Sequence, residues 1–140
     1  MGDCCKKGQT FLHKNATNYQ GTKPKYFIAL NQADGLEDEI VCFVINSENR
    51  MDKYVEGCNK GKGKYILKPN ELSFITHHSS IMLDLPIRYY VKELFENDFV
   101  ILDIANDLLC RQIKNCMNFD NIPSRFGNII KDCFKDKPSK

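Results

Sequence analysis

The sequence predicts an α+β domain in which a small, strongly curved antiparallel sheet or barrel is closed by C-terminal helices. Apolar runs of strand length, separated by turn-rich loops, fill most of the chain before residue 105. After that point apolar residues recur at helical spacing. Strands followed by helices are typical of the α+β class. A chain of 140 residues suits one domain with its own core.

The predicted domain spans residues 8–134. Residues 1–7 are expected to form a flexible leader, and they lack the apolar stretch that a secretory signal needs. Residues 135–140 are expected to form a flexible polar tail. The chain has no run of about 18 apolar residues, so we expect no membrane span.

Three apolar segments define the first strands. Residues 8–14 form a strand with Phe11 and Leu12 turned inward. Residues 26–30 are continuously apolar, which indicates a strand covered on both faces. Residues 40–45 are rich in β-branched and aromatic side chains and make the strongest strand. Further short strands are expected at 54–55, 65–67, 72–75, 80–83 and 99–102. Residues 87–94 suit a strand or a short helix, and Tyr89, Tyr90 and Val91 favour the strand.

Two helices are expected at the C-terminal end. The first is amphipathic, and Asp103 or Asn106 is suited to cap its start. Its apolar face holds Ala105, Leu108, Leu109, Ile113, Cys116 and Met117. A second helix begins within residues 121–124, because proline is favoured in the first turn. Its inner face holds Ile122, Phe126, Ile129, Ile130, Cys133 and Phe134.

The seven cysteines show neither CxxC spacing nor a Cys/His pattern suited to zinc. Four of them lie among apolar residues, where reduced cysteines pack as small hydrophobic groups. These four are Cys42, Cys110, Cys116 and Cys133. The pair Cys4 and Cys5 lies in the leader and is open to oxidation. We therefore expect a reducing compartment, the cytoplasm, and no bound metal.

The net charge of +2 is too small to require a polyanionic partner. The lysines are nevertheless grouped, with Lys23 and Lys25 in one stretch and four more between residues 60 and 68. These stretches fit either solvated surfaces or phosphate binding. Composition alone leaves both interpretations open.

Residues 64–88 contain the densest set of reactive side chains. His77 and His78 are adjacent, so on a strand they would point to opposite faces. Histidine transfers protons near neutral pH. Ser79 and Ser80 follow, with Arg88 just beyond. No nucleophile elbow or phosphate-binding glycine loop accompanies these residues.

The order of motifs resembles that of the PemK/MazF family of toxin endoribonucleases. Lys7-Gly8-Gln9 is similar to the opening strand of that family, and Gly21-Thr22-Lys23-Pro24 to the loop before its second strand. Ile45-Asn46-Ser47 is similar to the end of its next strand. The stretch Ser80 to Arg88 matches an apolar strand that leads to a catalytic arginine, and residues 105–117 match the closing helix.

The resemblance implies a small SH3-like barrel, usually dimeric. It implies an endoribonuclease that cuts single-stranded RNA without a metal or cofactor, leaves a cyclic phosphate and is blocked by a cognate antitoxin. Carried onto this chain, it implies catalytic roles for Arg88 and Lys23 at the phosphate. His78 is our candidate for proton transfer. The candidate substrate-binding residues are Asn46, Ser47, Ser80 and Lys64.

Two substitutions within the motifs motivate an alternative. Lys23 stands where the family has arginine, and lysine lacks the planar fork that grips a phosphate with two hydrogen bonds. Asn46 stands where the family has threonine and has no hydroxyl. The alternative is a non-catalytic PemK/MazF-like module that binds a protein or nucleic-acid partner.

Overall fold

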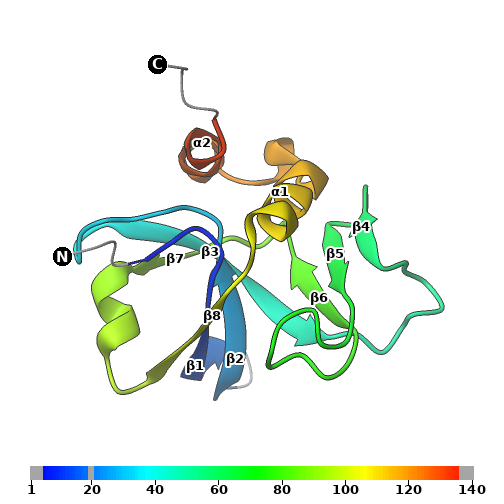
Figure 1. Ribbon diagram of the computed structural model, residues 1–140, viewed down its shortest axis with the longest axis horizontal. Helices are drawn as coiled ribbons and strands as arrows, with labels where there is room; N and C mark the ends of the chain where they lie inside the picture. The colour runs from blue at the N-terminus through cyan, green and yellow to red at the C-terminus, as the bar shows by residue number, and fades with distance from the viewer. Residues whose placement is uncertain (1–4, 19–20, 136–140) are drawn as a thin grey trace.

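The computed structural model describes residues 5–18 and 21–135, and within them it shows an eight-stranded antiparallel sheet followed by two C-terminal helices (Figure 1). The strands are β1 (Gln9–Asn18), β2 (Gly21–Ala29), β3 (Glu39–Ser47), β4 (Gly57–Asn59), β5 (Lys64–Leu67), β6 (Ser79–Met82), β7 (Ile87–Tyr90) and β8 (Phe99–Ile104). The helices are α1 (Asp107–Cys116) and α2 (Ser124–Cys133), with short 3-10 turns at Val91–Phe95 and Phe119–Asn121. The predicted α+β class is confirmed.

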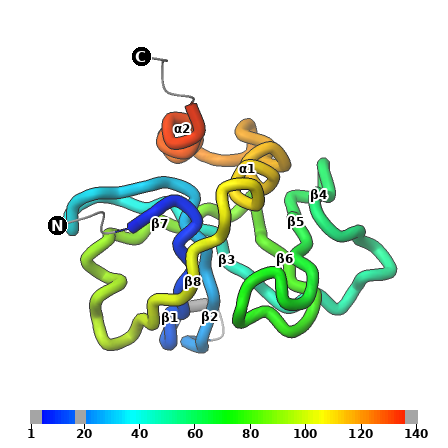
Figure 2. Tube along the Cα trace, in the orientation of Figure 1, coloured from blue at the N-terminus to red at the C-terminus, as the bar shows by residue number. Residues whose placement is uncertain are grey.

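Strand β3 is the centre of the sheet, whose order is β4-β5-β6-β3-β2-β1-β8. One edge of β3 pairs with β2, and the other pairs with β7 near its start and β6 near its end. Figure 2 shows β1, β2 and β8 on one side and β4, β5 and β6 on the other. No pairing among the described residues joins β4 to β8, so the predicted closed barrel is wrong.

Successive side chains of β3 point to opposite faces of the sheet, and each face has its own hydrophobic core. Val41 and Phe43 face one core, which α1 and α2 cover. Ile40 and Cys42 face the second core, with Phe11 and other aromatic rings. The prediction that residues 26–30 are covered on both faces is confirmed, because their side chains divide between the two cores. The most buried strands of this antiparallel sheet therefore have continuous apolar sequences.

Helix α1 begins where the capping residue predicts. The side-chain oxygen of Asn106 accepts a hydrogen bond from the backbone N–H of Leu109 at 2.8 Å. The helix buries Leu109, Cys110, Ile113 and Cys116, whereas Leu108, expected on the inner face, is 67% exposed. Helix α2 follows Pro123 and buries Ile130 against the sheet.

Several local elements differ from those expected. The strand predicted at 54–55 is absent, and β4 forms three residues later. Residues 72–75 form turns, and Asn70 takes a positive φ of 68° just before them. The segment 87–94 divides into β7 and a 3-10 turn. Short apolar runs specify burial better than they specify secondary structure.

The end of the expected leader is part of the fold. Cys5 pairs with Ala33 through two backbone hydrogen bonds and is buried. At Gly8 the φ angle is +92°, and an added Cβ would lie 2.7 Å from the carbonyl oxygen of Ala105. Glycine is therefore required where β1 begins. The rest of the expected leader, with Cys4, and the expected tail from residue 136 lie outside the described residues.

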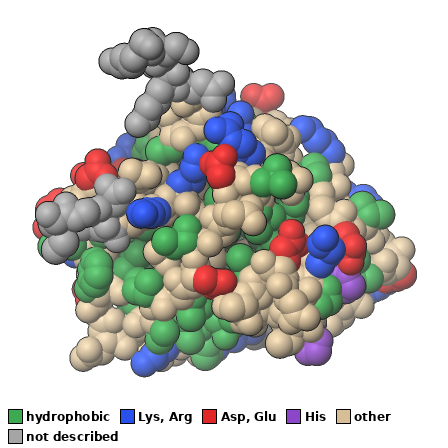
Figure 3. Space-filling view, in the orientation of Figure 1, with side chains coloured by type: hydrophobic (Ala, Val, Ile, Leu, Met, Phe, Trp, Pro, Cys, Tyr) green, Lys and Arg blue, Asp and Glu red, His purple; other side chains and the backbone are tan. Residues whose placement is uncertain are grey.

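Strand β8 lies at one edge of the sheet and carries exposed apolar side chains. Val100, Ile101 and Ile104 are all exposed. Figure 3 shows hydrophobic side chains gathered over this part of the molecule. Within the described part of the chain, no helix is long and apolar enough to cross a membrane.

Candidate functional site

A cleft opens where β2 and β3 separate. The two strands pair only as far as Tyr26 and Ile45. Beyond that point β2 continues along β1, whereas Asn46 and Ser47 of β3 pair with β6. The gap contains a cavity of about 500 Å³. It is lined by Lys23, Pro24, Lys25, Tyr26, Ile45, Asn46 and Ser47.

Two lysines stand at this cavity. Lys25 Nζ donates a hydrogen bond to Asn46 Oδ1 at 2.8 Å, across the gap between the strands. Burial, and then the charge of nearby Lys23, lower the pKa of Lys25. Within residues 5–18 and 21–135, neither lysine forms an ion pair with a carboxylate. The cavity therefore offers positive charge that an anion can neutralise.

A narrower groove of about 240 Å³ continues from this cavity and shares Tyr26, Ile45 and Ser47 with it. Its remaining lining residues are Phe74, Ile75, Thr76, His77 and Ser79. The rings of Tyr26 and Phe74 stack with their centroids 4.6 Å apart. We call the cavity and this groove together the β2–β3 cleft. It combines ammonium groups, an aromatic pair and an exposed imidazole.

The predicted binding residues Ser80 and Lys64 belong to a separate network around Glu48. The Glu48 side chain is only 7% exposed, and its carboxylate lies 2.8 Å from Lys64 Nζ. Ser80, which is buried, donates to the same carboxylate. Lys64 Nζ also lies over the ring of Tyr54, 4.3 Å from its centroid. These groups satisfy one another at the junction of β3, β5 and β6.

The hydrogen bonds within this network shift the pKa values of Glu48 and Lys64. Burial by itself would raise the pKa of Glu48, but hydrogen bonds from Lys64, Ser80 and the backbone N–H of Arg50 lower it overall. The same bond to Glu48 raises the pKa of Lys64. Both groups are thus held in their charged forms near neutral pH.

The two adjacent histidines point to different surroundings. His78 Nε2 lies 2.8 Å from Glu56 Oε2, in the segment that precedes β4. His77 is exposed and lines the β2–β3 cleft. The third histidine, His13, is 2.9 Å from the Tyr89 hydroxyl and stacks on Phe99. The structure therefore brings His77, and not the predicted His78, to the cleft.

Arg88 lies away from the cleft. It pairs directly with Val41, whose side chain faces the helix-covered core. Val41 and Asn46 are five residues apart on β3, which places them about 17 Å apart and on opposite faces. The guanidinium of Arg88 lies 3.4 Å from Glu39, which Arg125 of α2 also contacts. Among the predicted residues, the cleft joins Lys23, Asn46 and Ser47 only.

Lys25, His77 and the Tyr26–Phe74 pair were not among the predicted site residues. The alternation in Lys23-Pro24-Lys25 was one signal, because residues two apart on a strand share a face. No comparable signal exists for Phe74, which reaches Tyr26 from a loop 48 residues later in the chain. Within the described residues, no group of three His, Cys, Asp or Glu side chains is placed to hold a metal ion.

The chain matches no family model, and it has no significant match among curated proteins or solved structures. Its function is therefore inferred from the geometry of the β2–β3 cleft together with the motifs in the sequence.

Proposed function

We propose that this protein binds single-stranded RNA in the β2–β3 cleft. The observation that carries the proposal is the set of side chains around one cavity: Lys23 and Lys25 from β2, and Asn46 and Ser47 from β3. Ammonium groups neutralise phosphates, and an aromatic pair in the adjoining groove offers a surface on which a base stacks. Proteins that bind single strands commonly combine these two kinds of contact.

The single-stranded form follows from the stacking surface. In a duplex the faces of the bases are covered by their neighbours, so they cannot lie on a ring in a groove. An unpaired strand exposes these faces. The choice of RNA over DNA comes from the resemblance to PemK/MazF endoribonucleases, and the side chains of Asn46 and Ser47 are suitable partners for a ribose 2′-hydroxyl.

A binding titration tests this proposal. Fluorescence polarisation compares a labelled single-stranded RNA of mixed sequence with the same RNA as a duplex and with single-stranded DNA. We expect the single-stranded RNA to bind most tightly. The double variant Lys23→Met, Lys25→Met should lose this binding, whereas Lys135→Met, which changes an exposed lysine that pairs with Asp132, should retain it. Equal binding of the single-stranded RNA by the double variant and by Lys135→Met contradicts the proposal.

A second candidate function, RNA cleavage, is favoured by the position of His77. This imidazole lines the same cleft as the two lysines. Metal-independent cleavage needs a group to take the 2′-hydroxyl proton and cations to stabilise the charged phosphate. His77 is suited to the first role and Lys25 to the second. On this basis the protein would act as a toxin-like endoribonuclease, and the antitoxin and the homodimer remain predictions from the resemblance.

Cleavage is tested by incubating the RNA with the protein in the presence of a chelator. A denaturing gel then shows whether fragments appear, and end mapping shows whether they carry a 2′,3′-cyclic phosphate. We expect His77→Ala to abolish cleavage while RNA binding persists. RNA that is bound but stays intact would assign the protein to the non-catalytic class of binding module.

A further inference from the structure

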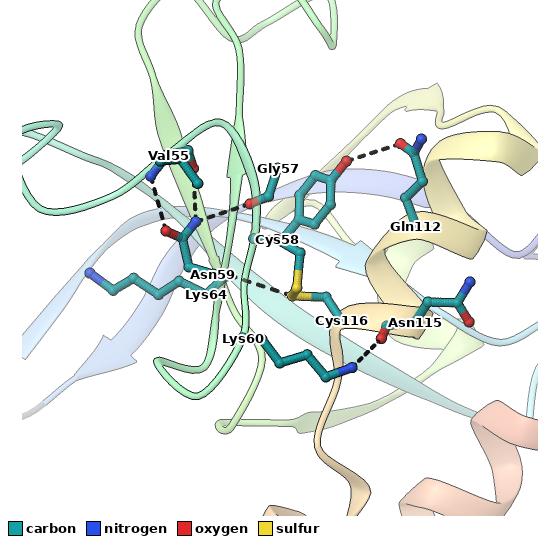
Figure 4. The surroundings of a disulfide bond; sticks show 10 residues. Val55, Gly57, Cys58, Asn59, Lys60, Lys64, Gln112, Asn115 and Cys116 are labelled. Atoms are coloured by element: carbon teal, nitrogen blue, oxygen red, sulfur yellow. Dashed lines mark hydrogen bonds between the residues drawn. A yellow bond between two sulfur atoms is a disulfide. The ribbon is translucent and has the colours of Figure 1, made fainter.

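A disulfide joins two distant parts of the chain on the side of the molecule away from β8. Cys58 of β4 is bonded to Cys116, the last residue of α1, across a sequence separation of 58 (Figure 4). This pairing differs from the expectation that Cys116 is a reduced core residue. Strand β4 is an edge strand of three residues and pairs only with β5. The bond therefore anchors an edge hairpin to a helix.

The disulfide lies in a groove that is open to solvent. Cys58 is exposed, and both cysteines line a cavity of about 340 Å³ with Gln112 and Asn115. A second cavity of about 280 Å³ shares Tyr65 and Gln112 with the first. The Tyr65 hydroxyl donates a hydrogen bond to Gln112 Oε1 at 3.0 Å, and both residues line the cavity that holds the disulfide. A small molecule can therefore approach the disulfide without unfolding of the core.

Two other cysteines of the chain are protected from such an approach. Cys42 and Cys110 are fully buried, and burial raises the pKa of the Cys110 thiol to about 11. A buried thiol with a raised pKa is a poor nucleophile and reacts slowly with thiol reagents. Access therefore distinguishes Cys58 from these core cysteines.

A cation stands next to the accessible sulfur. Lys60 follows Cys58 by two residues, and its Nζ donates a hydrogen bond to the backbone oxygen of Asn115 at 2.9 Å. Asn115 immediately precedes Cys116, so this ammonium group lies beside the disulfide. The species that attacks a disulfide is the thiolate, and a nearby positive charge attracts it.

We propose that Cys58 is a thiol-exchange site for a low-molecular-weight thiol of the glutathione class. The thiolate attacks Cys58 Sγ, a bond forms between the two sulfurs, and the bond between Cys58 and Cys116 breaks. Its electron pair goes to Cys116 Sγ, which then takes a proton from water. A second thiolate releases Cys58, so that two small thiols are oxidised to one disulfide while the protein gains two thiols.

Exchange would remove the covalent link between β4 and α1. The segment just before β4 carries Glu56, the partner of His78. Asn59 holds the turn together from within, because its side chain bonds the backbone N–H of Val55 at 2.9 Å and the Val55 oxygen at 2.8 Å. The segment from Val55 to Asn59 can therefore move as a unit, whereas β5 is held by its pairing with β6 and by its buried side chains. Loss of the bond should loosen residues 55–63 and leave β3 unchanged.

Mass spectrometry of the folded wild-type protein tests the proposal without any substitution. The protein is incubated with reduced glutathione, quenched with acid and digested. We expect a glutathione adduct on Cys58, and increased amide deuterium uptake within residues 55–63 but not in β3. An adduct on Cys116, or exchange that proceeds only as fast as global unfolding, overturns the proposal.

Two single substitutions provide a matched control. Cys116→Ser leaves Cys58 as a thiol, and Cys58→Ser leaves Cys116. With oxidised glutathione, we expect Cys58 to form its adduct roughly tenfold faster than Cys116, because Cys116 is buried. Equal rates in two folded variants contradict the assignment. RNA takes no part in these measurements, so their outcome is independent of the proposed binding function.

Discussion

Lys25 Nζ and Asn46 Oδ1 are 2.8 Å apart, and this hydrogen bond spans the gap where β2 leaves β3. It holds an ammonium group over the cavity while using only one of its donors. A phosphate that enters the cavity can take the remaining donors. Lys25 therefore has a central place in the proposed binding of RNA, although the motifs in the sequence pointed to Lys23.

The first prediction concerns the charge of Lys25. Lys25→Met should weaken binding of single-stranded RNA about tenfold and reduce the slope of log affinity against log salt concentration by about 0.7, the value for one lost phosphate contact. Polarisation titrations at several salt concentrations measure both effects. Lys25→Arg keeps the charge and should retain most of the salt dependence. An unchanged slope in Lys25→Met excludes a phosphate contact at this position.

The second prediction concerns Arg88. Because its guanidinium contacts Glu39 on the helix-covered face, Arg88→Ala should change RNA affinity less than twofold. Any cleavage should likewise continue at the rate of the unmodified protein. The side chain is 47% exposed, so the loss of this ion pair should have little effect on stability. A large loss of affinity or cleavage would show that the functional surface extends to β7.

The third prediction concerns pH. Because the pKa of Glu48 is lowered in the folded protein, its ionised form stabilises the fold above the unfolded pKa, about 4.3 for glutamate. This contribution is lost as the pH falls through the lower, folded pKa. Glu48→Gln should therefore cost about 2 kcal/mol at pH 7 and much less in acid. Urea denaturation at a series of pH values measures this difference.

An exposed ion pair gives the control for Glu48. Arg50 and Asp52 are 3.2 Å apart, and both side chains are more than half exposed. Asp52→Asn should cost less than about 0.5 kcal/mol at any pH, because solvent screens the pair. If both substitutions cost the same, burial of the Glu48 network does not contribute to its strength.

The fourth prediction concerns the disulfide. In the chain-entropy account, a cross-link between residues 58 positions apart stabilises a fold by about 4 kcal/mol through its effect on the unfolded chain. Reduction should therefore lower the unfolding midpoint in urea without a change of fold. The double variant Cys58→Ser, Cys116→Ser should reproduce the reduced protein. If reduction leaves the urea midpoint of the wild-type protein unchanged, the disulfide does not restrain the unfolded chain as expected.

Strong, local signals in the sequence correctly predicted much of the fold. The run Ile40–Ile45 lies within β3, and Asn106 caps α1 as its side-chain chemistry predicts. Apolar runs of only three or four residues were weaker predictors of strands. Leu72–Ile75 is apolar enough for a strand, yet the chain turns there, because packing and not propensity decides such short segments.

The site was harder to predict because it depends on where strands separate. Lys23 and Asn46 come together in the cleft, as the motif order implied. Arg88 does not join them, since β7 pairs with the start of β3 and β6 with its end. The spacing of Cys58 and Cys116 gave no sign of their bond, because residues 58 apart become neighbours only through the tertiary fold.

Ile45 belongs both to the lining of the β2–β3 cleft and to the hydrophobic core. It lines both parts of the β2–β3 cleft, and it is 4% exposed within the core that α1 and α2 cover. The packing of hydrophobic side chains behind Ile45 therefore supports one wall of the cleft. A substitution that adds or removes one methyl group in the core behind Ile45 can therefore change the shape of the cleft, and with it the choice of ligand, while every polar residue of the cleft stays in place.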